Sequence, residues 1–325
     1  MEYIKTWPDI MSGKKILYVH GFASSGQSGT VKLLRTVLPS ATVIAPDLPI
    51  HPTEAMDLLH RTCETEHPDL IIGSSMGGMM AEMLYGYDRI LVNPAFRMGD
   101  TMGSHGMIGK LTFLNPRQDG VQEMVITKAI VKEYRELTEQ CFSQDSGTVY
   151  GLFGDNDPLV HTRDIFLEHY DNAVSFHGEH RLVDSVVLHS LIPVVRWIDD
   201  RQTERQREVV YVDFDTLHDS RMMAAPSMLK AIRTLIDTYD VYFVADAPAN
   251  RPERYAAVSD WLCEYVNVPA YNRIVFTNYR HLLYGDYYIS TAPPSATLAT
   301  AITYGSDTFK TWEEVITFFK RLQGE

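Results

Sequence analysis

Short apolar runs alternate with amphipathic stretches along the first half of the chain, and this alternation restricts the fold more than any other feature. The runs are rich in β-branched residues: KILYVH from Lys15, TVIAP from Thr42, DLIIGS from Asp69, RILVNP from Arg89 and TVYGLFG from Thr148. Such runs are typical of strands buried on both faces of a parallel sheet. The intervening patterns predict helices over Val31–Leu38, Thr53–Thr65, Met76–Tyr85, Met124–Phe142 and Arg163–Tyr170. Together they predict a doubly wound α/β domain.

The pattern changes after a last helix predicted over Ser185–Ile198. The next ten residues, DDRQTERQRE from Asp199, are almost wholly polar and typical of a linker. A second, smaller βα pattern follows, with strands VVYVDFD from Val209, VYFVADAP from Val241 and RIVFTN from Arg273, and helices over Pro226–Asp237, Arg251–Val266 and Trp312–Leu322. Because 325 residues exceed the usual size of one core, we predict two domains, residues 1–200 and 209–325, joined by a linker at 201–208.

Charge and cysteine content restrict the partners and the compartment. The formal net charge of −13 argues against nucleic acid or an anionic membrane as the main partner. The three cysteines, Cys63, Cys141 and Cys263, have no metal-ligand spacing and indicate no disulfide framework. No apolar stretch approaches the ~20 residues that span a bilayer, and the N-terminus lacks a signal-peptide pattern. We therefore expect a soluble cytoplasmic protein; its oligomeric state stays open.

The segment Arg97–Gln122 interrupts the βα rhythm, since it holds several Gly and Met residues without a clear period. It is either a cap that borders a site or a surface connection.

The stretch DLIIGSSMGGMMAE contains G-x-S-x-G as Gly73, Ser75 and Gly77. A serine on a tight turn between a strand and a helix needs small neighbours, because the chain passes closely on both sides. Here the motif follows a predicted buried strand and precedes an amphipathic helix, which is the setting that such a serine requires. Ser75 is therefore the candidate nucleophile, and the Met76 amide at the start of the helix is a candidate oxyanion donor.

An acid and a base are expected downstream of such a serine, in that order. GDNDPLV offers Asp155 and Asp157, and we prefer Asp157 because Asp-x-x-Val leading into a helix is the usual setting of that acid. VSFHGEHRL offers His177 and His180 after a strand, and we prefer His180, which follows Gly178 and Glu179. Asp155 and His177 stay as the alternatives.

The first predicted strand ends in HGFASS, a loop of the kind that supplies a second oxyanion amide. Phe22 is the candidate donor, and His20 is expected to be structural.

These motifs resemble the small bacterial α/β-hydrolases of the YqiA-type esterase group over residues 15 to about 198. HGFASS, PDLPIHP, GSSMGGMMAE, LVNPA, GDNDPLV and HGEHRL occur in that family's order. The resemblance implies a carboxylester or thioester hydrolase acting on a small molecule without a cofactor, with Ser75, Asp157 and His180 as the triad. An aromatic residue often stands two positions after the histidine, where this chain has Leu182, which affects the shape of the pocket.

In the second predicted domain, Asp213 and Asp215 form a D-x-D at the end of an apolar strand. Such a pair can act as phosphoryl nucleophile and general acid around Mg²⁺, although acidic residues are common after strands.

Residues 208 to 322 resemble the deoxyribonucleotidase branch of the haloacid-dehalogenase-like phosphatases, a smaller Rossmann-like α/β fold. That resemblance implies a phosphate-binding Ser or Thr, a Lys and an acidic metal-binding pair. This chain instead has Ala245 and Asp246, Arg280, and Ser290 with Thr291 at those positions. Only Asp213 and Asp215 remain as weak Mg²⁺ candidates, with Asp286 as a substitute, so we expect a degenerate domain.

Three hypotheses follow. The chain is a serine hydrolase with an inactive phosphatase-like domain, which we prefer. Alternatively it is a magnesium-dependent phosphatase or nucleotidase, or a non-catalytic binding protein.

Overall fold

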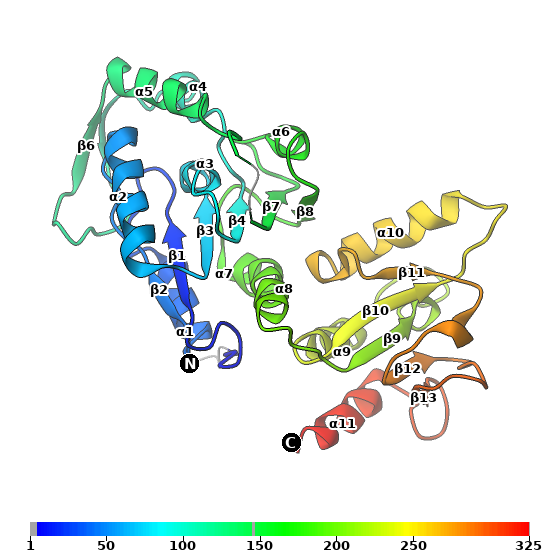
Figure 1. The fold of residues 1–325 in the computed structure, drawn as a ribbon. Helices are drawn as coiled ribbons and strands as arrows, with labels where there is room; N and C mark the ends of the chain where they lie inside the picture. Colours follow the sequence, from blue (N-terminus) through cyan, green and yellow to red (C-terminus); the bar gives the residue numbers. More distant parts are fainter. Residues whose placement is uncertain (1–4, 145–146, 325) are drawn as a thin grey trace. The chain divides into compact units, whose positions relative to one another are not determined.

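The computed structural model describes residues 5–144 and 147–324. The chain divides into two compact units between Thr203 and Glu204, and each is described here by itself (Figure 1). The last helix of the first unit continues to Gln202, two residues into the linker predicted at 201–208. The prediction of two consecutive α/β folds is confirmed.

The first unit is built on a six-stranded sheet in the order β2-β1-β3-β4-β7-β8. Its neighbouring strands all pair in parallel. The strands are β1 (Lys15–Val19), β2 (Thr42–Ile44), β3 (Leu70–Ser74), β4 (Arg89–Val92), β7 (Val149–Gly154) and β8 (Asn172–Phe176). The helices are α1 (Gly29–Val37), α2 (Pro52–Glu66), α3 (Met76–Glu82), α4 (Met98–Ser104), α5 (Lys128–Thr138), α6 (Arg163–Leu167), α7 (Asp184–Val186) and α8 (Ile192–Gln202), with a π-helical turn at Val187–Leu191.

The order of the strands fixes where a site can form. The chain runs from β1 outward to β2 and then returns past β1 to β3, so the direction of winding reverses between β1 and β3. Right-handed crossovers then place α1 on one face of the sheet and α2 and α3 on the other. Loops that leave the carboxyl ends of β1 and β3 diverge at this point, which is where doubly wound sheets hold their ligands.

The segment between β4 and α5 is more ordered than its sequence indicates. It contains α4 and a two-stranded antiparallel ribbon of β5 (Gly109–Thr112) and β6 (Glu123–Ile126). The helix predicted over Met124–Phe142 is wrong at its start, because residues 124–126 pair with β5 and the helix begins at Lys128, after the N-cap Thr127.

The second unit holds a five-stranded sheet in the order β11-β10-β9-β12-β13, also parallel throughout its pairs. Its strands are β9 (Val209–Asp213), β10 (Asp240–Ala245), β11 (Ile274–Phe276), β12 (Tyr287–Ser290) and β13 (Thr300–Thr303). Its helices are α9 (Pro226–Ile236), α10 (Glu253–Tyr265) and α11 (Trp312–Leu322), with short 3₁₀ turns at Phe214–Thr216, Val268–Ala270 and Arg280–Leu282.

The core of the second unit packs all three helices against this sheet through residues such as Ile232, Leu262 and Phe319. Here the winding reverses between β9 and β12, so Asp213, the last residue of β9, lies at the position where ligands bind in such sheets.

Across the part of the chain that the structure describes, no helix is both long and apolar enough to cross a bilayer.

Candidate active site

Ser75 lies on a sharp turn between β3 and α3. Its backbone adopts φ 56° and ψ −119°, a conformation that non-glycine residues rarely take and that costs on the order of 1–3 kcal/mol. Close packing explains the flanking glycines: a Cβ on Gly73 would lie 2.3 Å from the Gly77 carbonyl oxygen, and one on Gly77 would lie 2.1 Å from the Val19 carbonyl oxygen. The turn thus holds the serine hydroxyl above the carboxyl edge of the sheet.

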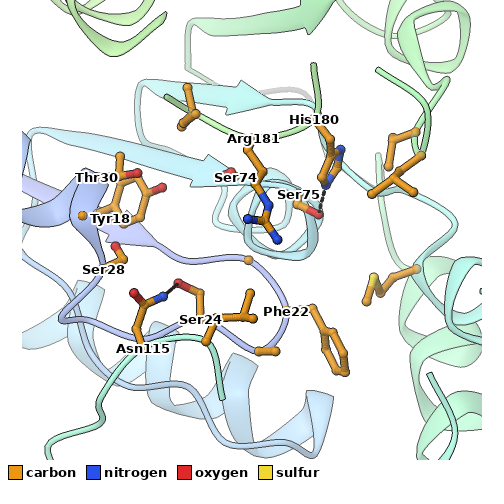
Figure 2. Close-up of a pocket in the computed structure, with 18 of the residues that line it drawn as sticks. Tyr18, Phe22, Ser24, Ser28, Thr30, Ser74, Ser75, Asn115, His180 and Arg181 are labelled. Carbon is orange, nitrogen blue, oxygen red and sulfur yellow. Dashed lines mark hydrogen bonds between the residues drawn. The ribbon is translucent and has the colours of Figure 1, made fainter. Parts of the chain in front are cut away.

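The structure brings Ser75, His180 and Asp157 together. His180 Nε2 lies 2.8 Å from Ser75 Oγ, and His180 Nδ1 lies 2.8 Å from Asp157 Oδ2 (Figure 2). With the ring proton on Nδ1, the imidazole donates to Asp157 and accepts the hydroxyl proton of Ser75. This is the hydrogen-bond chain that a serine needs for attack on a carbonyl carbon.

The Asp157 carboxylate is held in its ionised form by donors around it. Burial opposes its ionisation, since the residue is only 4% exposed. Hydrogen bonds from His180 and from the amides of Leu159 and Val160, at 2.8 and 3.1 Å, nevertheless lower the pKa of this carboxyl below its usual value. An ionised acid at this position fixes the imidazole tautomer and stabilises the imidazolium.

The alternative acid and base pair with each other and not with the serine. Asp155 Oδ2 lies 2.5 Å from His177 Nδ1, and its other oxygen accepts hydrogen bonds from the Gly178 amide and from Asn156. Both side chains are substantially exposed. The geometry therefore favours Asp157 and His180 as the partners of Ser75.

Asn93 is a residue of the site that sequence reasoning missed. It is 2% exposed, and its amide nitrogen donates to the carbonyl oxygens of Glu179 and His180, at 3.1 and 3.2 Å. Its Oδ1 accepts from the Gly154 amide at 2.8 Å, at the end of β7. Asn93 thus ties the histidine loop to the sheet. Its only sequence signal is the motif LVNPA, which carries no chemistry by itself.

Two backbone amides, of Phe22 on the loop after β1 and of Met76 at the start of α3, have no acceptor in the part of the chain that the structure describes. Amides left free beside a nucleophile can stabilise an oxyanion. The loop that carries Phe22 is fixed by the buried His20, whose Nδ1 bonds the Gly21 carbonyl at 2.9 Å and whose Nε2 accepts from the Leu48 amide at 3.1 Å. Burial lowers the pKa of His20, which fits the neutral, structural form.

A cavity of about 560 Å³ opens beside Ser75 and His180. The Arg97–Gln122 segment borders it through Met98, Thr101, Met107, Leu114 and Asn115. Three hydrogen bonds fasten this segment to the Phe22 loop: Leu114 N to the Ala23 carbonyl at 2.7 Å, Asn115 Nδ2 to Ser24 Oγ at 3.1 Å, and Ser25 Oγ to the Pro116 carbonyl at 2.6 Å. The segment is therefore part of the site.

In the second unit, an arginine pairs with two of the aspartates at the carboxyl ends of the strands. Arg280 donates from Nε to Asp213 Oδ1 at 2.9 Å and from a terminal nitrogen to Asp246 Oδ1 at 2.6 Å. Asp213 is buried, whereas Asp215 is exposed. The cavity that Asp215, Asp246 and Arg280 line measures only about 10 Å³, at the lower limit for one water molecule.

These residues do not fit a divalent cation. Within residues 5–144 and 147–324, no group of three or more His, Cys, Asp or Glu side chains could hold a metal ion. A guanidinium already neutralises Asp213 where a cation would lie. Asp286, the substitute ligand, instead accepts from the Val209 amide at 2.7 Å at the start of β9, and the Ser290 hydroxyl accepts from the Ala292 amide.

The order serine, aspartate, histidine, each following a strand of one parallel sheet, is the arrangement of the α/β-hydrolase fold, and the first unit has that fold. Within this class, residues 15–186 match the Uncharacterised protein family UPF0227, and the chain belongs to that family.

Several solved structures are similar to the chain at low identity. The monoacylglycerol lipase of Paleococcus ferrophilus is 17% identical, with a TM-score of 0.41, over 57% of this chain and 94% of that one. Est1E from Butyrivibrio proteoclasticus is 15% identical, with a TM-score of 0.42, over 60% and 89%.

A curated protein of Vibrio phage KVP40, described as a putative 5'(3')-deoxyribonucleotidase, is 24% identical over 102 residues. The match covers 30% of this chain and 60% of the phage protein's length.

Proposed function

We propose that the first unit is a serine hydrolase that cleaves carboxylesters or thioesters of small molecules through an acyl-enzyme. The observation that carries the proposal is the continuous chain from Ser75 Oγ to His180 to Asp157, with both links at 2.8 Å, at the edge of an open cavity. Membership in UPF0227 is consistent with it but assigns no activity.

In this mechanism the Ser75 oxygen attacks the substrate carbonyl carbon while His180 Nε2 takes the hydroxyl proton. The Phe22 and Met76 amides donate to the resulting oxyanion. Collapse of the tetrahedral intermediate breaks the bond to the alcohol or thiol, which leaves with the proton from His180. Water then attacks the acyl-enzyme, with His180 again as base, and releases the acid and free Ser75. These steps use only groups of the chain and need no cofactor.

Labelling and turnover test the proposal together. The full-length protein is expected to hydrolyse short-chain 4-nitrophenyl esters and to react with a fluorophosphonate probe, which mass spectrometry should locate on the peptide that contains Ser75. The protein unfolded in urea before labelling is the control, because only the folded site activates the serine. Absence of both label and turnover on every ester would refute the hydrolase.

We further propose that the second unit is a haloacid-dehalogenase-like domain without phosphatase activity. The strand order, the position of Asp213 at the end of β9 and the distant phage relative support the likeness. The Arg280 guanidinium bonded to Asp213 supports the loss of activity, since the carboxylate would otherwise be the nucleophile. Release of phosphate from deoxynucleotides in the presence of Mg²⁺ would favour the alternative phosphatase.

The ion pair between Arg280 and Asp213 leads to a prediction about the stability of the second unit. Arg280→Met should lower the free energy of unfolding of the second unit by about 1–3 kcal/mol, because it leaves the buried Asp213 carboxylate without its partner. Urea unfolding of the full chain measures this, and the double variant Asp213→Asn/Arg280→Met should recover most of the loss. Millimolar Mg²⁺ should not raise the melting temperature of the wild type; a clear rise would show a cation site.

A further inference from the structure

The cavity beside Ser75 has a distinctly polar side. Figure 2 shows Tyr18, Ser24, Ser28, Thr30 and Asn115 gathered to one side of Ser75, away from His180. Much of the remaining lining is apolar and includes Phe22, Met98, Met107, Leu159 and Val160. A substrate that fills the cavity must therefore present a polar group on one side of the scissile carbonyl.

Arg181 brings a positive charge to that polar side. It directly follows His180 and is exposed, and in Figure 2 its side chain reaches down beside Ser75, on the side of that serine where the polar residues lie. Its guanidinium forms no hydrogen bond or ion pair with any residue that the structure describes. A planar cation with its donors unused, beside a nucleophile, is suited to bind a carboxylate or phosphate in a bidentate manner.

The other charged residue of the lining, outside the triad, is Asp184. It is exposed at the start of α7 and forms no ion pair with Arg181. The Arg181 guanidinium is therefore not neutralised by Asp184 and can bind a negatively charged group of a substrate.

The polar side of the cavity also offers neutral donors. Tyr18 is only 3% exposed, and burial raises the pKa of its phenol to about 12 despite its hydrogen bonds with Thr30 and Ser74. The phenol thus stays protonated at neutral pH and can donate. Gly29 and Thr30, also in the lining, form the first turn of α1, whose amide end favours negative charge.

We propose that the site accepts esters bearing a negatively charged group, a carboxylate or a phosphate, and that Arg181 is the residue that selects for this group. The inference rests on the proposed hydrolase function and names its substrate class. The charged group lies on the polar side of the cavity, while the apolar lining takes the rest of the ester. Arg181 acts in binding; it takes no proton and forms no bond to the acyl group.

Matched esters that differ only in charge test this proposal. On the acyl side the pair is 4-nitrophenyl hydrogen adipate and its methyl ester, because the longer chain disfavours attack of the free carboxylate on the ester. On the alcohol side it is 4-acetoxyphenylacetate and its methyl ester, because the two leaving phenols have nearly the same pKa. A 4-nitrophenyl ester of 5-phosphonopentanoate compares phosphonate with carboxylate. For at least one pair, kcat/KM of the wild type should be higher for the charged member.

Arg181→Gln should reduce the charged-to-neutral ratio of kcat/KM by roughly 10–100-fold, the value of a charge-assisted pair. Arg181→Lys should retain part of the preference for the charged ester, because lysine keeps the positive charge but lacks the parallel N–H donors of the guanidinium. Arg61→Gln on α2 is the matched control, since it removes the same charge from an exposed position outside the cavity. An unchanged ratio in Arg181→Gln, or an equal change in Arg61→Gln, would overturn the assignment.

A binding measurement separates this inference from the hydrolase proposal. Succinate and phenylphosphonate should bind the wild type in isothermal titration calorimetry, and Arg181→Gln should weaken that binding roughly 10-fold or more. Hydrolysis of neutral esters without anion binding would keep the hydrolase and reject the role of Arg181. Anion binding lost in Arg181→Gln, without hydrolysis of any ester, would keep the anion site and reject the hydrolase.

Discussion

Ser75→Ala is expected to lower kcat/KM for 4-nitrophenyl esters by roughly 10⁴–10⁶-fold and to abolish fluorophosphonate labelling. Ser75 Oγ is the oxygen that lies 2.8 Å from His180 Nε2, so the variant removes the nucleophile and leaves the rest of the site in place. Alanine meets the same backbone restriction as serine at φ 56°, and the stability of the fold should change little. Stopped assays with an excess of enzyme provide the sensitivity that this loss requires.

Ser74→Ala is the matched comparison, because Ser74 is the neighbouring hydroxyl at the end of β3 and bonds neither His180 nor Asp157 among the described contacts. This variant should still take the label on Ser75. A label on Ser74 in the wild type, or turnover retained in Ser75→Ala, would contradict the assignment of the nucleophile.

Asp157→Asn should reduce kcat by about 10²–10⁴-fold with a smaller effect on KM. The amide cannot stabilise the imidazolium that forms as His180 takes the proton, and it favours the wrong ring tautomer. Asp155→Asn is the matched control from the same loop and should change kcat by no more than about threefold, because Asp155 pairs with His177. A larger loss of kcat in Asp155→Asn than in Asp157→Asn would show that Asp155 is the acid of the triad.

The free energies of unfolding of the wild type and of Asp157→Asn should depend on pH in different ways. The pKa of Asp157 is lowered in the folded protein, so its ionised form stabilises the fold above the ordinary carboxyl pKa of about 4. That contribution is lost as the pH falls through the folded value. The difference in unfolding free energy between wild type and Asp157→Asn should therefore shrink between about pH 5 and pH 2, as measured by urea unfolding.

Local patterns were sufficient to predict the strand, turn and helix that hold Ser75. A G-x-S-x-G motif between a buried strand and a helix located the turn at Ser75, and chain order selected loops that contain Asp157 and His180. Local context favoured Asp157 and His180 but left Asp155 and His177, which stand two and three positions away, as alternatives. The choice depends on which side chains the ends of β7 and β8 direct toward β3, a property of the assembled sheet.

Features that depend on distant pairing were missed. The start of the helix predicted at Met124 was wrong because residues 124–126 pair with β5, a partner more than ten residues away that helical periodicity does not show. Asn93 acts through carbonyl oxygens 86 and 87 residues downstream. The Arg280–Asp246 contact likewise joins two loops of the second unit, and neither residue type alone indicates it.

The loop after β1 has a consequence for any attempt to evolve new substrate preferences. This one short stretch holds the Phe22 amide and also contributes Ser24 and Ser28 to the cavity wall. Mutagenesis libraries placed there would change recognition and catalytic rate together, and most members would be slow. Met98, Thr101 and Met107 border the same cavity from another segment and are not among the proposed reacting residues, so diversity placed there should change selectivity with a smaller effect on turnover.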